Sequence, residues 1–267
     1  MPPDPPVELI ARDEPPAPSA QTCGAPSGCP AGFCDPFPSE LAAYVHQARN
    51  WFWIRAGISA AVDSRVLPLW DDHVSGGTST QNLTSSFGAD FAASPTTTST
   101  SRFLLGELES ALTTSPPTVA EGSTVTVDIP ATIPAAVSAI DDPADSDRMN
   151  FNVISDIPGN IAGDIGRDQL SCQSGKQPSP HNDERNVTGA ADVTRTSATT
   201  LQVTPSLDYE VKDTIDLCPG NCGSSLEQIA TVPMSQWEAT GISGDVPITV
   251  EFSPSLTAFD VTAPASP

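Results

Sequence analysis

An aspartate on the apolar side of an alternating segment is the residue of this sequence best placed to do chemistry. Between Leu201 and Leu217, the odd-numbered positions are mostly apolar and the even-numbered positions are polar. Successive side chains of a β-strand point to opposite faces, so this alternation predicts a strand with one buried and one exposed face. Asp213 falls on the buried face, where a carboxylate is costly unless it is hydrogen-bonded, paired or protonated.

Three interpretations of Asp213 are open from the sequence, besides a mistaken strand register. Two are structural: a β-bulge, or hydrogen bonds accepted from the backbone of the CPGNCG turn (218–223). The third is a functional acid, for which the candidate partners are Asp216 and His181, the latter in the HNDER loop (181–185). A spacing of three residues places Asp213 and Asp216 on opposite faces of a regular strand, so only a bulge would bring these two carboxylates together.

Six cysteines in two groups of three are compatible with disulfide bonds: Cys23, Cys29, Cys34, Cys172, Cys218 and Cys222. We expect Cys172 to pair with Cys218 or Cys222, because that bond would tie the irregular 157–190 stretch to the sheet. Two of the three N-terminal cysteines would then pair with each other and leave one over, or one of the three would pair with the remaining C-terminal cysteine. The competing interpretation is a zinc site formed by Cys172, His181, Cys218 and Cys222, although C-x8-H and C-x3-C are not strong zinc patterns.

Composition excludes several classes of protein. The sequence has 33 acidic and 11 basic residues, a net charge of −22, and it lacks the basic clusters that bind phosphate groups. We therefore expect no nucleic-acid partner. The apolar stretches are far shorter than the ~18 residues of a membrane helix, and the first residues lack the regions of a secretory signal. HExxH, Walker, GxGxxG and GxSxG motifs do not occur, and we expect no cofactor.

The first half of the sequence predicts helices behind a proline-rich leader. Residues 1–38 hold 11 of the 28 prolines and end in a knob with three cysteines. A helix is expected after an N-cap at Ser39, with an apolar stripe formed by Leu41, Tyr44, Val45, Ala48, Trp51, Phe52, Ile58 and Val62. Shorter helices are expected at 64–74 and 100–113, and the Gly-, Ser- and Thr-rich stretch 75–100 is interpreted as a loop with one helical turn.

The second half predicts mostly strands, together with a brief helix at 131–140. Strands are expected from Ser123 and over 151–154, 191–197, 201–217, 229–232 and 246–252, with SATT (197–200) as a hairpin turn. A bend is expected near Pro205. The fold class is therefore α+β, with a helical subdomain (39–120) and an antiparallel β-rich domain (121–262). A half-barrel is one arrangement that this β-rich domain could adopt.

Several segments resemble a family of bacterial proteins. They are GFCDPF (32–37), LGELESAL (105–112), MNFNVISDIPGNIAGDIG (149–166), YEVKDTIDLCPGNCG (209–223) and MSQWEATGISGDVPITVEF (234–252). Together they resemble C-terminal regions of proteins linked to extracellular contractile injection systems, which are phage-tail-like particles. The HExxH segment often fused upstream in that family does not occur here. The resemblance implies a cargo, effector or particle-associated protein, a toxin among the options, that contacts tube or baseplate proteins. It also implies a bacterial cytoplasmic protein that is loaded into, or released with, the particle.

A second resemblance concerns the colicin M type of bacteriocin, which cleaves a peptidoglycan precursor. The family pattern couples Asp-x-Tyr-Asp to a later His-Arg, and Asp213-Thr-Ile-Asp216 keeps the two acids but has Ile215 in place of tyrosine. No His-Arg follows. Three classes of function are therefore open: a binding or cargo protein of an injection particle, a cell-envelope hydrolase that uses Asp213, Asp216 and His181, and a structural component without catalysis.

Overall fold

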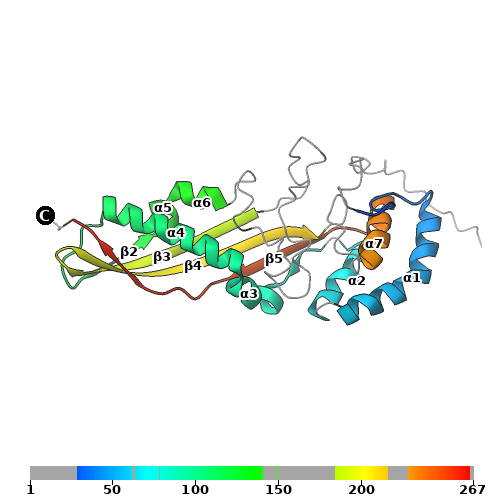
Figure 1. Cartoon of the computed structure of the whole chain (residues 1–267), viewed down its shortest axis with the longest axis horizontal. Helices are drawn as coiled ribbons and strands as arrows, with labels where there is room; N and C mark the ends of the chain where they lie inside the picture. The colour runs from blue at the N-terminus through cyan, green and yellow to red at the C-terminus, as the bar shows by residue number, and fades with distance from the viewer. Residues whose placement is uncertain are drawn as a thin grey trace, which may run out of the picture.

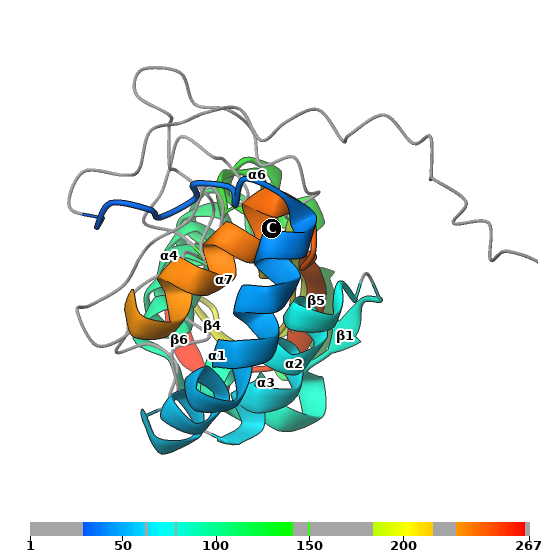
Figure 2. The same cartoon turned by 90° about the vertical axis from the view of Figure 1, so that its right-hand side faces the viewer.

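The computed structural model describes residues 29–61, 64–77, 79–140, 149, 184–215 and 228–264. These residues form an α+β structure, as predicted, with an open sheet that is not closed into a barrel. The described part is elongated, with the sheet running along its length (Figure 1). Helices α4, α5 and α6 lie over one face of the sheet, and α1, α2 and α7 gather at one end (Figures 1 and 2).

The element bounds follow the chain in two groups. The helices are α1 (Glu40–Ala61), the 3-10 helix η1 (Ser64–Val66), α2 (Leu67–Ser75), α3 (Thr84–Ala93), α4 (Pro95–Thr114), α5 (Ile129–Thr132), α6 (Pro134–Ile140) and α7 (Gln228–Thr240). The strands are β1 (Gln81–Asn82), β2 (Thr124–Asp128), β3 (Glu184–Ser197), β4 (Thr200–Ile215), β5 (Val246–Phe252) and β6 (Phe259–Thr262). None of the described helices is both long and apolar enough to cross a membrane.

The sheet is built around one long hairpin. The strand order is β1-β5-β4-β3-β2, and β6 pairs with β4 in line with β5. All of these pairs are antiparallel except β1 with β5. β3 and β4 are joined at residues 198–199, which confirms the hairpin turn expected at SATT. Long antiparallel partners joined by a tight turn keep a single register, and the β3–β4 register shifts only between Arg195 and Ser197.

The alternation in β4 is confirmed. From Leu201 to Asp213, every odd-numbered residue is buried, and the even-numbered residues are exposed or half-buried. The buried side chains join those of β3, β5 and the covering helices in one hydrophobic core. The opposite face of the sheet is polar and acidic, and cross-strand hydrogen bonds such as Thr126 to Asp192 (2.6 Å) link its side chains. No described element covers this polar face in Figure 1.

β4 is not interrupted at Pro205, where the sequence predicts a bend. Pro205 pairs with Ala191 in an unbroken register. On the side away from β3, β4 pairs with β6 up to Val203 and with β5 from Tyr209 onward. Residues 204–208 therefore have no strand partner on that side and form a short edge of the sheet. Proline lacks an N–H and is tolerated where a strand has such an edge.

Serine side chains cap the first turns of α1 and α4. The Ser39 hydroxyl accepts a hydrogen bond from the Ala42 amide (3.2 Å), which confirms the expected N-cap of α1. Ser94 caps α4 in the same way, accepting from the Thr97 amide (3.1 Å) just before Pro95. The stretch 75–100 is therefore not mainly a loop, because it holds all of α3 and the start of α4.

The segment 229–232, predicted as a strand, is the first part of α7. Thr231, Met234, Ser235 and Trp237 are buried, a spacing typical of a helix, and Pro233 lies inside it. α7 packs against α1: the Trp237 Nε1 donates to His46 Nδ1 (3.2 Å), and Trp51 contacts the Trp237 ring edge to face (6.1 Å between centroids). The inner face of α1 therefore carries His46 and Trp51 together with Ala43 and Ile54.

Candidate functional site

The structure places Asp213 in a buried ion pair with an arginine that the sequence interpretation had put in a loop. Asp213 lies on β4, in regular register with Ile248 of β5, so the bulge interpretation is wrong. The Arg185 Nη2 lies 2.6 Å from the Asp213 Oδ2, and the two side chains are only 0% and 2% exposed. Arg185 and Glu184 belong to β3 rather than to a polar loop.

Backbone carbonyls also hold Arg185 in place. Its guanidinium donates to the carbonyl oxygens of Lys212 (2.6 Å), Glu184 (3.2 Å) and Met149 (3.2 Å) in addition to the Asp213 carboxylate. A charge pair inside a protein is tolerated when its remaining donors and acceptors are hydrogen-bonded, and this pair meets that condition. The carboxylate thus has its charge balanced within the core.

A second buried arginine lies at the other end of β3. Arg195 is 2% exposed, and it donates to the carbonyl oxygens of Val119 (3.0 Å), Ala198 (2.8 Å) and Pro264 (3.4 Å). No carboxylate contacts Arg195 among the residues that the structure describes, and its Nη2 has no hydrogen-bond partner there. Arg195 therefore ties the hairpin turn to the chain before β2 and after β6.

The other predicted site residues lie outside the described residues. These are Asp216, His181, Cys172, Cys218, Cys222 and Cys23, so the hydrolase constellation, the zinc site and the Cys172 pairings stay predictions. Cys29 and Cys34 are both in disulfide bonds. Within the described part of the chain, no three metal-binding side chains come together.

His73, on α2, is another buried titratable group. It is 1% exposed, and neither ring nitrogen has a hydrogen-bond partner of good geometry in the described part. Burial lowers the pKa of His73 to about 4, and nearby backbone groups of Gly244 and Met234 offset part of this effect. Its Nε2 lies 3.7 Å from Glu238 on α7, so a neutral imidazole faces a carboxylate across the α2–α7 contact.

The outer face of α1 exposes large apolar side chains. We call it the docking face and define it by five residues with their exposed fractions: Leu41 (73%), Tyr44 (52%), Val45 (41%), Phe52 (71%) and Trp53 (72%). Of the predicted apolar stripe, Trp51 is half-buried against α7, whereas Leu41, Tyr44, Val45, Ala48 and Phe52 are exposed. The contact with α7 is made by the opposite face of α1, which carries His46, Trp51 and the small Ala43.

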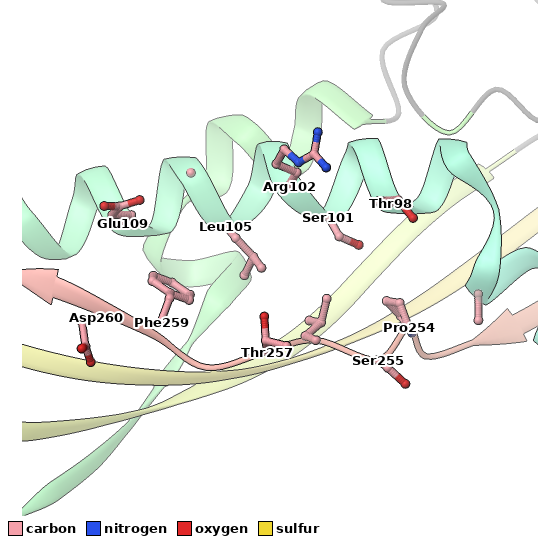
Figure 3. Close-up of a pocket in the computed structure, with 13 residues that line it drawn as sticks. Thr98, Ser101, Arg102, Leu105, Glu109, Pro254, Ser255, Thr257, Phe259 and Asp260 are labelled. Atoms are coloured by element: carbon pink, nitrogen blue, oxygen red, sulfur yellow. The ribbon is translucent and has the colours of Figure 1, made fainter.

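A cleft lies between α4 and the segment that links β5 to β6. Its volume is about 530 Å³, and it is lined by residues of α4 and of 254–260. Figure 3 shows Leu105 pointing from α4 toward Thr257 and Phe259, whereas Arg102 and Glu109, which also line the cleft, project from its rim on α4. Ser101, at the edge of this cleft, hydrogen-bonds the Tyr209 hydroxyl (2.9 Å). Burial raises the pKa of Tyr209 to about 12, so Tyr209 stays neutral and anchors α4 to β4.

Comparisons with known proteins provide no relative for this arrangement: no family model, curated protein or solved structure matches the chain. The features that sequence reasoning missed are Arg185, the docking face and the cleft. A signal for Arg185 was present, because extending the alternation of Val187, Ala191 and Val193 back by one step turns Arg185 inward, opposite Val211 and beside Asp213.

Proposed function

We propose that this chain is a non-catalytic binding component of a contractile injection particle, and that it docks on a tube or baseplate protein through the outer face of α1. The exposed docking face carries this proposal. A monomer rarely exposes several large apolar side chains together unless they contact a partner. An amphipathic helix laid into an apolar groove is a common way for proteins to associate.

Charge specifies the partner surface further. Residues 41–61 contain Arg49 and Arg55 and no acid, although the whole chain has 33 acidic and 11 basic residues. Arg55 is held by Asp71 on α2 (2.8 Å), which leaves the exposed Arg49 beside the apolar stripe. A partner groove that is apolar at its centre and acidic at its rim would complement this surface, whereas a second copy would bring together two molecules of charge −22.

The buried ion pair supports a binding role over the hydrolase alternative. A general acid or base must reach the substrate proton directly or through one water. Asp213 is 4% exposed and its carboxylate is already engaged by Arg185. The resemblance to contractile injection system proteins supplies the identity of the partner, and this part of the proposal depends on the sequence alone.

Site-specific photo-crosslinking tests the proposal. A photoreactive phenylalanine analogue replaces Phe52 in the strain that produces the particle, and the particle is then purified and irradiated. We expect an adduct with a tube or baseplate protein, identified by mass spectrometry. The matched control places the same analogue at Ile229, an equally exposed residue (66%) on α7, and should give no such adduct. Absence of the chain from purified particles would overturn the particle assignment, and adducts at both positions would overturn the assignment to α1.

A further inference from the structure

The segment between β5 and β6 leaves its backbone unpaired along an open edge of the sheet. β5 reaches Phe252 opposite Tyr209, and β6 begins at Phe259 opposite Val203. We call the segment from Phe252 to Phe259 the link. It advances 7 residues over a distance that β4 covers in 6, from Tyr209 to Val203. The link is therefore nearly as extended as a β-strand. Within the part of the chain that the structure describes, the backbone of 254–258 makes no hydrogen bond.

The edge beyond this segment is free, whereas the neighbouring edge of β5 is closed. β1 pairs with β5 at Ile248 and Thr249, and the Thr84 hydroxyl accepts from the Glu251 amide (2.9 Å). No described strand pairs with β6 or with the link on the side away from β4. An extended backbone with unpaired N–H and C=O groups is a template for pairing with another chain.

The cleft lies next to this unpaired backbone and offers an apolar pocket. Leu105, Leu256 and Phe259 line it and are half-buried. Gly106 also lines it, and a Cβ at Gly106 would meet no atom within 4 Å, so there is room for a larger side chain at this position. Figure 3 shows the cleft between α4 and the link, with Leu105 pointing into it.

Two opposite charges flank the cleft on α4. Arg102 and Glu109 are both exposed lining residues and lie seven residues apart, which corresponds to two helical turns or about 10 Å. In an extended strand, side chains on one face repeat about every 6.6 Å. A ligand strand would match these charges if it carried an acid and a base four residues apart, because long side chains can span the remaining difference in distance. An apolar residue midway between them would lie on the same face of the strand.

We propose that the cleft between α4 and residues 253–262 binds an extended peptide segment of a partner protein by β-strand addition. The peptide backbone pairs with the free N–H and C=O groups of 255–258. Its apolar side chain enters the pocket formed by Leu105, Leu256 and Phe259, and its acidic and basic side chains face Arg102 and Glu109. This site is separate from the docking face, and it holds whether or not the particle assignment is correct.

Two synthetic peptides test the proposal with the full chain. They are acetyl-Thr-Asp-Thr-Leu-Thr-Lys-Thr-amide and its reverse, acetyl-Thr-Lys-Thr-Leu-Thr-Asp-Thr-amide, and binding is followed by fluorescence anisotropy of labelled forms. A peptide can pair with the link in a parallel or an antiparallel direction, and each of the two peptides aligns its charges with Arg102 and Glu109 in only one of these directions. We therefore expect one peptide to bind more tightly than the other. Replacing the central leucine by alanine should weaken binding about tenfold or more, from the loss of the buried side chain. N-methylation of the threonine amides should abolish it.

Chain variants locate the site. Gly106→Phe fills the cleft and should abolish binding, whereas the control Thr114→Phe adds the same ring at an exposed position of α4 outside the cleft. Arg102→Glu should weaken the better peptide about two- to fivefold, and exchanging the peptide's acid for lysine should restore binding. Circular dichroism checks that each variant is folded.

Three results would overturn the proposal. The first is no binding of either peptide at millimolar concentration, and the second is binding that Gly106→Phe leaves unchanged. The third is self-association of the chain, measured by sedimentation, that Gly106→Phe abolishes, because it would assign the edge to a second copy instead. Amide chemical-shift changes confined to 255–262 on adding the peptide would support strand addition at this edge.

Discussion

The sheet and the helical end of this molecule place polar and apolar side chains in opposite ways. In the sheet, the charged residues Arg185, Asp213 and Arg195 are buried on the apolar face and hydrogen-bonded there. At the helical end, Leu41 and Phe52 are exposed on α1. The comparison teaches that the position of a residue in its element does not by itself reveal its role. Buried charges are tolerated in the core when they are paired or hydrogen-bonded, whereas exposed apolar side chains are available to a partner.

Breaking the Arg185–Asp213 pair should have the largest effect on stability. Arg185→Met leaves a buried carboxylate without its partner, and we expect a loss of about 3–5 kcal/mol in the free energy of unfolding, measured with urea. The double variant Arg185→Met/Asp213→Leu removes both charges and should recover most of that loss, since replacing a whole buried pair by apolar residues is often neutral. A double variant as unstable as the single one would show that the pair has another role.

Acid should destabilise the helical end through His73. The folded-state pKa is about 4 and the ordinary value is 6.5, so the unfolded chain binds the proton more tightly. The contribution of neutral His73 is complete above pH 6.5 and is lost as the pH falls toward 4, by up to about 3 kcal/mol. The variant His73→Leu should lose less stability over that range than the wild type, as measured by urea unfolding at each pH. Equal losses would contradict a buried neutral imidazole.

Arg195→Met should cost less than Arg185→Met, because no buried carboxylate is left behind. The variant removes donors to the carbonyl groups of Val119 and Ala198, and we expect a loss of about 1–3 kcal/mol. Thermal unfolding followed by circular dichroism measures it. A loss equal to that of Arg185→Met would mean that the two arginines do not differ as their partners suggest.

Part of this fold follows from local sequence patterns. The alternation in β4 predicts the strand, its two faces and the inward position of Asp213, and all three are confirmed. The β3–β4 turn and the Ser39 cap are also local signals. A local pattern does not, however, identify which residue of another strand a side chain contacts. The Arg185–Asp213 contact could not be predicted in this way, because it depends on the register of β3 against β4.

The helices show a different limit. The apolar stripe of α1 predicts a buried face, but a helix with aromatic residues on both sides has two candidate faces. Only the position of α7 decides that His46 and Trp51 are inside and that Phe52 is outside. The segment 229–232 is too short for its period to separate a strand from a helix, and the buried positions further along α7 settle its structure.

Substitutions on the docking face should have the smallest effect on stability and a large effect on association. Leu41→Gln and Phe52→Gln remove side chains that are 73% and 71% exposed, so each should change the free energy of unfolding by no more than about 0.5 kcal/mol. Urea unfolding of each single variant measures this. A loss of more than about 2 kcal/mol would show that α1 buries this face within the molecule.

Co-sedimentation with the purified injection particle tests the central claim most directly. The double variant Leu41→Gln/Phe52→Gln is compared with the wild type and with Ile229→Gln, which removes an exposed apolar side chain of α7. We predict that the wild type and Ile229→Gln sediment with the particle, and that the fully folded double variant remains in the supernatant. A double variant that sediments as well as the wild type would contradict docking through α1.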